Sequence, residues 1–506
     1  MSLLTFKALF ELIRFPSGVL LFLYLHQTSF DKIIMVNPYI EIDKKIVSEI
    51  YTSSEAYDNL KTLCDVYGSR FPGTPGDLGS VKYMKDKFEE YGVDDVYVEK
   101  YNIPGWTRGP ATLEVISPVK RELEVIALPG SVSGELETKL IDLGSGPVDI
   151  FEKRKDDLAG NIAIVSSATP IGAKRNLHRS EKYNRSILAG AKGFIYMNRT
   201  PGFGPITGGM TPVVPTVGIG YEDGLYLQRL VKRFGDVTIR IKVEGKNHEV
   251  ETYNVVAEIK GTSNSKEYGL TGSHYDGHDI SQGAFDPASG AVTVMEMART
   301  IAMVKGKLKR SLKFVQFGAE ETGLWGSNYY VKEHESELGD CRFMLNLDSC
   351  GANGRKGFIL NDVPDMNPLI DQWAEDMKAE LPYIHRVSPY SDHWPFFQKG
   401  VPTASGADPE VSLVTPFGHT KYDTLDKIKQ WDLRRAAANY SRFMFRVANL
   451  DDWNVGRKSQ AEIEAFIAQQ GYDETVAITD RLKEYVSKWD DIHPDTTAWI
   501  GRDSAW

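Results

Sequence analysis

The 506-residue chain has only three cysteines, Cys64, Cys341 and Cys350, and none of them belongs to a C-x-x-C motif. Such an odd and sparse set cannot form a disulfide framework, and it suits a reducing compartment. The lack of closely paired cysteines also argues against thiolate metal binding and disulfide redox chemistry. Any metal site would therefore have to use histidine and carboxylate ligands.

The chain also has fewer basic than acidic residues. The chain has 59 lysine and arginine residues against 69 acidic ones, a formal net charge of −10. This balance argues against a nucleic-acid partner and against binding to anionic membranes. The 42% hydrophobic and 25% charged residues are typical of a globular protein. Its length exceeds what one compact core supports, so two or three domains are expected.

The sequence lacks a clear membrane span. The N-terminal apolar run 18–25 follows Lys7 and Arg14 and resembles a short signal segment. However, it has no small-x-small cleavage site, and it is too short to cross a bilayer. Residues 1–39 could therefore be a signal or anchor, a translated upstream extension with Met35 as the true start, or an amphipathic helix. A cytoplasmic location is slightly favoured over secretion.

The rest of the chain falls into three regions with different patterns. Helical patterns dominate from residue 40 to about 91, short β-like runs separated by glycine-rich turns fill 111–245, and strand-loop-helix units recur from about 254. This order predicts an α/β fold in which helices flank a mostly parallel sheet. The predicted domains are a discontinuous main domain at 40–110 and 246–450, a β-rich insert at 111–245, and a helical C-terminal extension at 451–506. In the insert, His178 and Asp156-Asp157 are interpreted as surface residues.

Chemically active residues gather after the predicted strands. His274-Tyr-Asp276 follows one strand, and two residues along an extended chain the Asp276 carboxylate faces the same way as the imidazole and could orient it. Asp286-Pro287 opens a helix, where the acid is either an N-cap or a carboxylate that bridges two metals. Each motif alone has an ordinary structural explanation.

Three further motifs complete the pattern. Glu320-Glu321 follows a strand, and adjacent carboxylates are tolerated when a cation takes one charge and the other acid acts as a base. Asp348 ends the next strand, and His419 lies in a late loop. Together the motifs supply two imidazoles, three carboxylates and one spare glutamate, which suits two metal ions that share a bridging carboxylate.

These motifs resemble those of peptidase family M28, a family of di-zinc exopeptidases. The resemblance rests on GAFDPASG (283–290), FGAEETG (317–323), NLD (346–348) and SDHWPFF (391–397). The insert, with AGAKGFIY (189–196) and VPTVGI (214–219), is similar to a protease-associated (PA) domain. GSRFPGTPG (68–76) and IPGWTRG (103–109) are most similar to the plasma glutamate carboxypeptidase, or carboxypeptidase Q, branch. The resemblance thus covers about residues 40–450.

The resemblance implies a role for each residue of the pattern. Two zinc ions per chain would be held by His274 with Asp348, by Glu321 with His419, and by Asp286 between them, and Glu320 would be the general base. Pro287 departs from the family, which usually has Asp or Asn there after a cis peptide bond. Because proline lowers the cost of a cis bond to about 0.5–1 kcal/mol, a cis Asp286–Pro287 bond is predicted.

The expected activity is hydrolysis of short peptides or dipeptides by a metal-bridging water and Glu320. Tyr390 is a candidate donor to the oxyanion, and His278 and Asp279 are loop residues that could border the site. Alternatives are an aminopeptidase acting on longer peptides, an inactive binding protein of the same fold, and a single-zinc acyltransferase of the glutaminyl-cyclase kind. Peptide substrates are the expected partners, and homodimer formation is left open.

Overall fold

The computed structural model describes residues 37–263, 265–351, 354–409 and 416–487, and the described residues from Tyr39 onward belong to one compact unit. The apolar run 18–25, on which the leader and extension hypotheses depend, lies outside the described residues. Among the residues that are described, no helix has the length and apolarity needed to cross a membrane.

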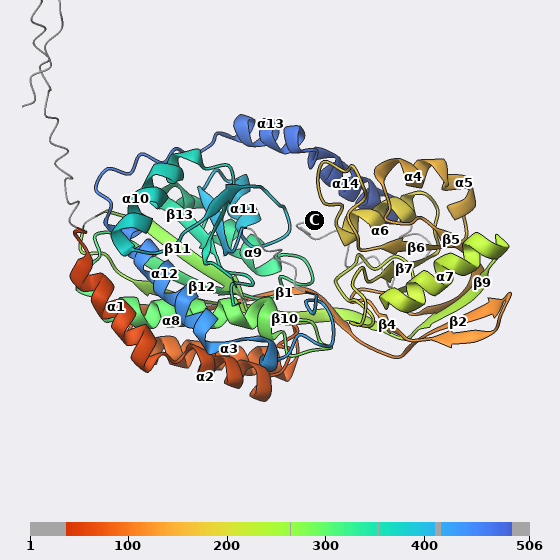
Figure 1. Cartoon of the computed structure of the whole chain (residues 1–506), viewed down its shortest axis with the longest axis horizontal. Helices are drawn as coiled ribbons and strands as arrows, with labels where there is room; N and C mark the ends of the chain where they lie inside the picture. Colours follow the sequence, from red (N-terminus) through yellow and green to blue (C-terminus); the bar gives the residue numbers. More distant parts are fainter. Residues whose placement is uncertain (1–36, 264, 352–353, 410–415, 488–506) are drawn as a thin grey trace, which may run out of the picture. The chain divides into compact units, whose positions relative to one another are not determined.

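An eight-stranded sheet forms the main domain (Figure 1). The central strands are parallel to their neighbours, and the outer pairs β1–β10, β10–β12 and β14–β16 are antiparallel. The predicted α/β class is confirmed, with a mixed sheet. In spatial order the strands are β1 (Asp95–Thr107), β10 (Lys246–Ile259), β12 (Ser311–Phe317), β11 (Tyr268–His274), β13 (Cys341–Asn346), β16 (Thr403–Ala407), β14 (Gly357–Leu360) and β15 (Tyr383–His385).

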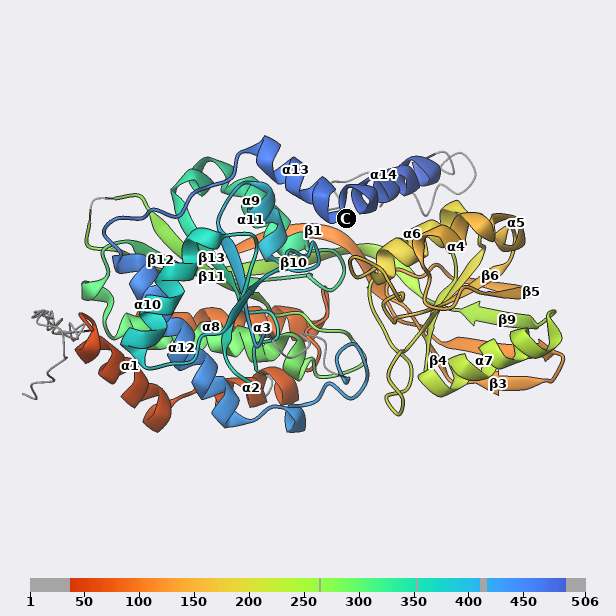
Figure 2. The same cartoon turned by 45° about the horizontal axis from the view of Figure 1, so that its top comes forward.

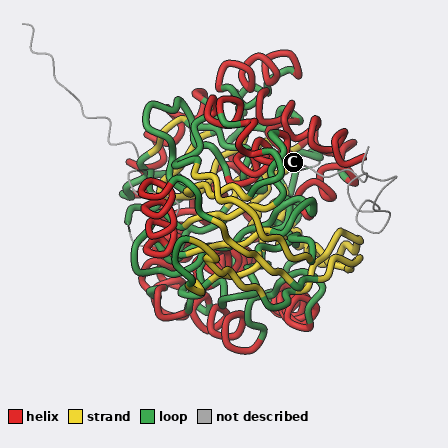
Figure 3. The backbone as a smooth tube through the Cα atoms, turned by 90° about the vertical axis from the view of Figure 1, so that its right-hand side faces the viewer, coloured by secondary structure: helices red, strands yellow, loops and turns green. Residues whose placement is uncertain are grey.

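Helices cover both faces of this sheet, and Figure 3 shows the strands enclosed between them. Val255 packs with one set of helices and Val256 with the other, since successive side chains of a strand point to opposite faces. One face is covered by α1 (Ile40–Ser53), α2 (Ala56–Lys61), α3 (Pro75–Glu90), α8 (Ser289–Ala302), α10 (Asn367–Met377) and α12 (Gln430–Asn449). The other face is covered by α9 (Trp325–Glu333) and α11 (His393–Gln398).

The central strand β11 positions the site. Every residue from Tyr268 to His274 is buried, as expected for a strand with helices on both sides. β11 is parallel to β12 and β13, so their carboxyl ends meet at one edge of the sheet. This edge is where open α/β sheets bind their ligands. His274, Glu320-Glu321 and Asp348 all lie there.

A second eight-stranded sheet forms the insert, with its own two hydrophobic clusters. Its strands in spatial order are β3 (Arg121–Leu123), β2 (Ala111–Ser117), β9 (Thr238–Val243), β5 (Gly134–Asp142), β6 (Ile162–Ser166), β7 (Gly193–Met197), β8 (Thr216–Ile219) and β4 (Val125–Ala127). Its helices are α4 (Val148–Lys153), α5 (Lys155–Leu158), α6 (Arg179–Leu188) and α7 (Tyr221–Phe234). The β-rich character read from the sequence is therefore present.

Two long strands lead into and out of the insert. β1 and β10 pair antiparallel from Asp95↔Glu258 to Thr107↔Lys246, and Figure 2 shows them side by side in orange and green. The chain enters the insert immediately after β1 and leaves it immediately before β10.

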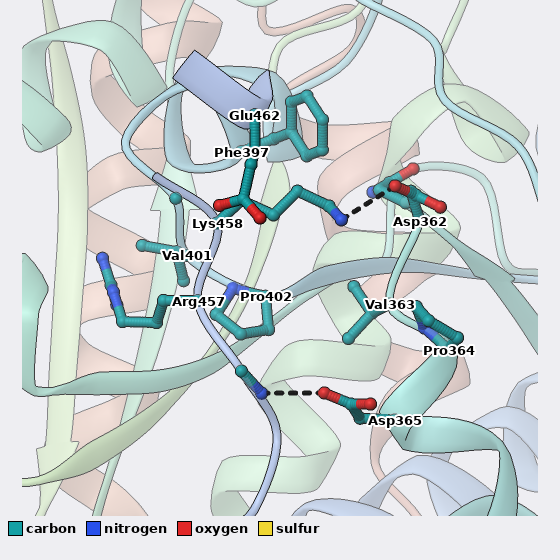
Figure 4. Close-up of a pocket in the computed structure, with 13 residues that line it drawn as sticks. Asp362, Val363, Pro364, Asp365, Phe397, Val401, Pro402, Arg457, Lys458 and Glu462 are labelled. Carbon is teal, nitrogen blue, oxygen red and sulfur yellow. Dashed lines mark hydrogen bonds and ion pairs between the residues drawn. The ribbon is translucent and has the colours of Figure 1, made fainter. Parts of the chain in front are cut away.

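The C-terminal extension lies against both domains. α13 (Gln460–Gln470) begins with a complete capping box at Ser459 and Glu462 and packs on α11, while α14 (Asp473–Ser487) packs on α6. The segment before α13 closes a cavity of about 190 Å³, in which Lys458 pairs with Asp362 at 2.8 Å (Figure 4). No residue proposed to hold a metal lines this cavity.

Candidate metal centre

His274 is the last residue of β11 and is buried. Its Nδ1 lies 3.0 Å from the carbonyl oxygen of Asp276, which can accept the Nδ1–H. Its Nε2 faces Oδ1 of Asp286 at 3.5 Å and Oδ1 of Asp348 at 3.4 Å. The backbone carbonyl therefore selects the tautomer whose free nitrogen points at two carboxylates.

Asp276 contacts the site through both its carbonyl oxygen and its carboxylate. Its carboxylate oxygen Oδ1 is 3.6 Å from Nδ1 of His274, too far for a good hydrogen bond. Instead the carboxylate accepts the backbone N–H groups of Glu320 at 3.0 Å and Glu321 at 3.2 Å. The carbonyl of Asp276 therefore makes the shorter contact with the imidazole and the carboxylate fixes the two glutamates, while a role of the carboxylate in orienting the imidazole stays a prediction.

Asp286 lies between the two histidines. Oδ1 faces His274, and Oδ2 is 3.3 Å from Nε2 of His419. The Asp286–Pro287 peptide bond is cis, which confirms the prediction.

His419 has its ring between the main domain and the insert. Its Nδ1 is 3.3 Å from the carbonyl oxygen of Thr207, and its Nε2 is 3.7 Å from Oε2 of Glu321. The residue has a φ of +57°, in the left-handed region that few residues other than glycine adopt. Such backbone conformations cluster at functional sites, where the surrounding structure holds them in place.

The donor set fits two zinc ions that share Asp286. Ligand atoms bound tetrahedrally to zinc at 2.0–2.1 Å lie about 3.3 Å apart. The contacts of Asp286 with His274 and His419, at 3.5 and 3.3 Å, are close to this value. Within the described residues, His274, Glu320 and Asp348 form one possible ligand group, and His278, Glu321 and His419 form another.

The electrostatics of these side chains favour positive charge between them. Burial raises the pKa of Glu321 to about 8. Burial alone would also raise the pKa of Asp286, but His274 and His419 outweigh it and hold that pKa below its ordinary value. Burial lowers the pKa of His419, yet Glu321 and Asp286 reverse the shift. Buried carboxylates crowded in this way are stabilised by a cation.

Glu320 stands beside this donor set. Burial raises the pKa of its carboxyl well above the ordinary value, and the neighbouring acids Glu321 and Asp348 reinforce the shift, which His274 opposes. A glutamate whose pKa is raised toward the working pH suits general acid–base catalysis. The hydrogen bond from its backbone N–H to Asp276 fixes its position at the end of β12.

Tyr390 remains a prediction as the oxyanion donor. Its ring stacks on His178 of the insert, with ring centroids 4.0 Å apart. Its hydroxyl is buried and has no hydrogen-bond partner among the described residues. The stacking also corrects the prediction for His178, which is half-buried in this contact and not a surface residue.

The sequence patterns do not identify Arg179 as a site residue. It is the first residue of α6 in the insert and is buried, with its Nε donating to the carbonyl of Gly209 at 3.2 Å. Its Nη1 lies 3.5 Å from Nδ1 of His419, and in the described part of the chain no carboxylate pairs with the guanidinium. Its position 240 residues before His419 leaves no sequence signal that would join them.

The chain is similar to known peptidases. The model of peptidase family M28 matches residues 254–444, and that of the PA domain matches residues 133–227. Carboxypeptidase Q of Xenopus laevis is 24% identical over 431 residues, which are 82% of this chain and 91% of the relative.

Two solved structures extend the similarity. A peptidase M28 precursor from Shewanella amazonensis SB2B aligns at 26% identity and a TM-score of 0.73, covering 83% of this chain and 98% of the other. BSAP, a zinc aminopeptidase from Bacillus subtilis, aligns at 25% identity and a TM-score of 0.61, covering 78% and 95%. This chain is therefore a hydrolase of the zinc metallopeptidase family M28 with an inserted PA domain, near the carboxypeptidase Q branch.

Proposed function

We propose that the chain is a di-zinc exopeptidase that hydrolyses dipeptides and short peptides next to their free C-terminus. The observation that carries the proposal is the position of Asp286, whose two carboxylate oxygens face His274 and His419 at 3.5 and 3.3 Å. His274 and Asp348 would hold one zinc, Glu321 and His419 the other, and Asp286 both. Zinc bound there would polarise the scissile carbonyl and lower the pKa of the attacking water.

Glu320 moves the proton in this proposal. Its carboxylate takes a proton from the water whose oxygen bonds to the carbonyl carbon, and then delivers it to the leaving nitrogen as the C–N bond breaks. No proton is gained or lost overall. The hydrogen bonds from Glu320 and Glu321 to Asp276 keep the base and its ligand neighbour in fixed relative positions.

Arg179 supports a substrate with a free carboxylate. The guanidinium reaches the metal centre from the insert, and among the described residues its Nη2 has no hydrogen-bond partner. A planar guanidinium with free donors suits a carboxylate, which it can bind through two parallel hydrogen bonds. A free α-ammonium group would be repelled at this point.

Asp279, five residues after His274, is not available for a substrate amine. Asp279 forms a two-point ion pair with Arg108, in which Nε and Nη2 lie 2.7 and 2.6 Å from its two oxygens. This pairing removes one candidate for an aminopeptidase subsite. Aminopeptidase activity on longer peptides nevertheless remains the second candidate, because BSAP is a zinc aminopeptidase.

One comparison of substrates tests the proposal. The full-length protein with two equivalents of zinc is assayed on Xaa-Xaa dipeptides, the same dipeptides amidated at the C-terminus, longer peptides, and amino-acid anilides. Efficient hydrolysis of free dipeptides, with amidation lowering kcat/KM by at least about tenfold, is expected. Equal or better turnover of anilides and amides would overturn the C-terminal assignment, and no zinc-dependent hydrolysis would overturn the enzymatic one.

A further inference from the structure

His278 is a third buried imidazole at the metal centre. It lies in the loop between β11 and α8, four residues after His274. Its Nε2 is 2.9 Å from Oε2 of Glu321 and 3.1 Å from Nδ1 of His419. The sequence alone indicates only a loop residue that could border the site.

The loop that carries His278 is held firmly. The guanidinium of Arg70 donates to the carbonyl of Tyr275 at 2.6 Å and to that of Gly283 at 2.9 Å, on either side of His278. The N–H of Gly277 donates to the carbonyl of Ser69 at 2.8 Å. Because the backbone is fixed on both sides, the position of the imidazole is determined by the fold.

The contact with Glu321 defines the tautomer of His278. Glu321 must be ionised to hold a metal, and an ionised carboxylate only accepts hydrogen bonds, so in that state the 2.9 Å contact requires a proton on Nε2. Nδ1 is then an unprotonated nitrogen, and it has no partner within the described residues. The opposite tautomer would bury an N–H without an acceptor and turn a lone pair toward the carboxylate, which costs free energy twice.

The second carboxylate oxygen of Glu321, Oε1, is free to bind a metal. Oε1 is buried and, in the part of the chain that the structure describes, makes no hydrogen bond. With Oε2 held by His278, rotation of the carboxylate is restricted, and Oε1 is left without a partner among the described residues and available to a cation. Partners of this kind that hold metal ligands typically contribute 10- to 100-fold to metal affinity.

We infer that His278 is a positioning residue that fixes the Glu321 carboxylate for one of the two metals, and is not itself a metal ligand. Its contact with Oε2 of Glu321 is shorter than the separation of about 3.3 Å between ligands on one tetrahedral zinc. This inference rests on the proposed two-metal function. Its test therefore measures metal binding directly, on a protein whose wild-type stoichiometry is measured in the same experiment.

The experiment titrates metal-depleted full-length protein with zinc against a chromogenic chelator. H278L, which removes the hydrogen bond, is expected to weaken one of the two binding steps by about 10- to 100-fold and to leave the other unchanged. H278Q is expected to stay within about threefold of wild type, because its amide reaches the Nε2 position and donates. The control is H385A, at an exposed histidine of β15.

The outcomes are distinct. If wild type binds fewer than two zinc ions, the proposed function fails. If wild type binds two and H278L is unchanged, only the positioning role is wrong, and if H278Q loses a metal as completely as H278L, His278 is a ligand. Should H278L not fold, H278N replaces it, since the shorter amide cannot reach Glu321 and must bind as weakly as H278L would.

Discussion

Asp423 holds the backbone of Asp286. Its Oδ2 accepts the N–H of Asp286 at 3.0 Å, and its Oδ1 accepts the N–H of Phe285 at 2.8 Å. Asp423 lies four residues after His419, so one short loop supplies an imidazole and also fixes the carboxylate that faces it. Two of the three groups proposed to bind the second metal, His419 and Asp286, therefore depend on the same loop.

D423N should loosen this arrangement, because asparagine has one oxygen where aspartate has two, and its amide would face a backbone N–H. We expect zinc affinity to fall by about 10- to 100-fold and hydrolysis to recover partly with excess zinc. Zinc titration of the depleted protein measures the change. D426N, at an exposed acid of the same segment, should match wild type. Unchanged zinc affinity in D423N would show that Asp286 needs no such support.

R179M tests the substrate contact. Loss of a charged hydrogen-bonding partner should raise KM for free dipeptides by about 10- to 100-fold and leave amidated dipeptides nearly unaffected. The zinc content, measured in parallel, should not change, since methionine keeps the aliphatic packing of the side chain. An equal loss on both substrate types would assign Arg179 to the support of His419 alone.

Y472A tests the C-terminal extension. Tyr472 is buried, donates to the carbonyl of Val387 at 3.2 Å and lies beneath the guanidinium of Arg175. The next helix, α14, adds Glu474 to the ion pairs of α6, at 3.0 Å from Arg185. Loss of the ring should destabilise the protein by roughly 2–4 kcal/mol.

Because α6 begins with Arg179, Y472A should also raise KM for dipeptides while both metals stay bound. V476A, at an exposed position of α14, is the matched control. Urea unfolding and dipeptide kinetics measure the two effects. A destabilised Y472A with wild-type KM would show that the extension stabilises the fold without positioning Arg179.

Lys182 makes stability depend on pH. Burial lowers its pKa to about 7, and its Nζ donates to the carbonyls of Ser166 and Ala168 at 2.8 and 2.7 Å. Between pH 7 and the ordinary lysine pKa of 10.5, the unfolded chain holds a proton that the folded one lacks. This group therefore makes the protein more stable as pH rises through that interval, by about 1.4 kcal/mol per unit.

K182M removes this titration. The unfolding free energy of K182M relative to wild type should be about 2–3 kcal/mol higher at pH 6 than at pH 9, whatever its absolute value. Urea unfolding at the two pH values measures the difference. An equal offset at both would mean that Lys182 keeps its ordinary pKa in the fold.

Much of the fold could be predicted because hydrophobic patterns and turn residues are local. The strand-loop-helix units expected from about residue 254 are present, for example as β11, the loop after it and α8. The edge strands were harder to assign, since nothing in β10 itself shows that it pairs antiparallel with both β1 and β12.

The site, like the fold, could be predicted only in part from the sequence. The ligands His274, Glu321 and Asp348 lie at strand ends and could be found from the sequence, whereas Arg179 reaches the site only because the insert packs there. The contact of the Asp276 carbonyl with His274 could not be predicted, because spacing shows which way a side chain points but not whether its carbonyl is the nearer acceptor. The role proposed for His278 depends on its contact with Glu321, which the sequence does not show.

The most direct test of the central claim is to count metals and turnover together in E320Q. Glutamine keeps the shape of Glu320 but cannot take a proton, so dipeptide turnover should fall by about 10²- to 10⁴-fold while two zinc ions per chain stay bound. E321Q, at the adjacent proposed ligand, should instead lose one of them. Wild-type turnover in E320Q with both metals bound would contradict the account.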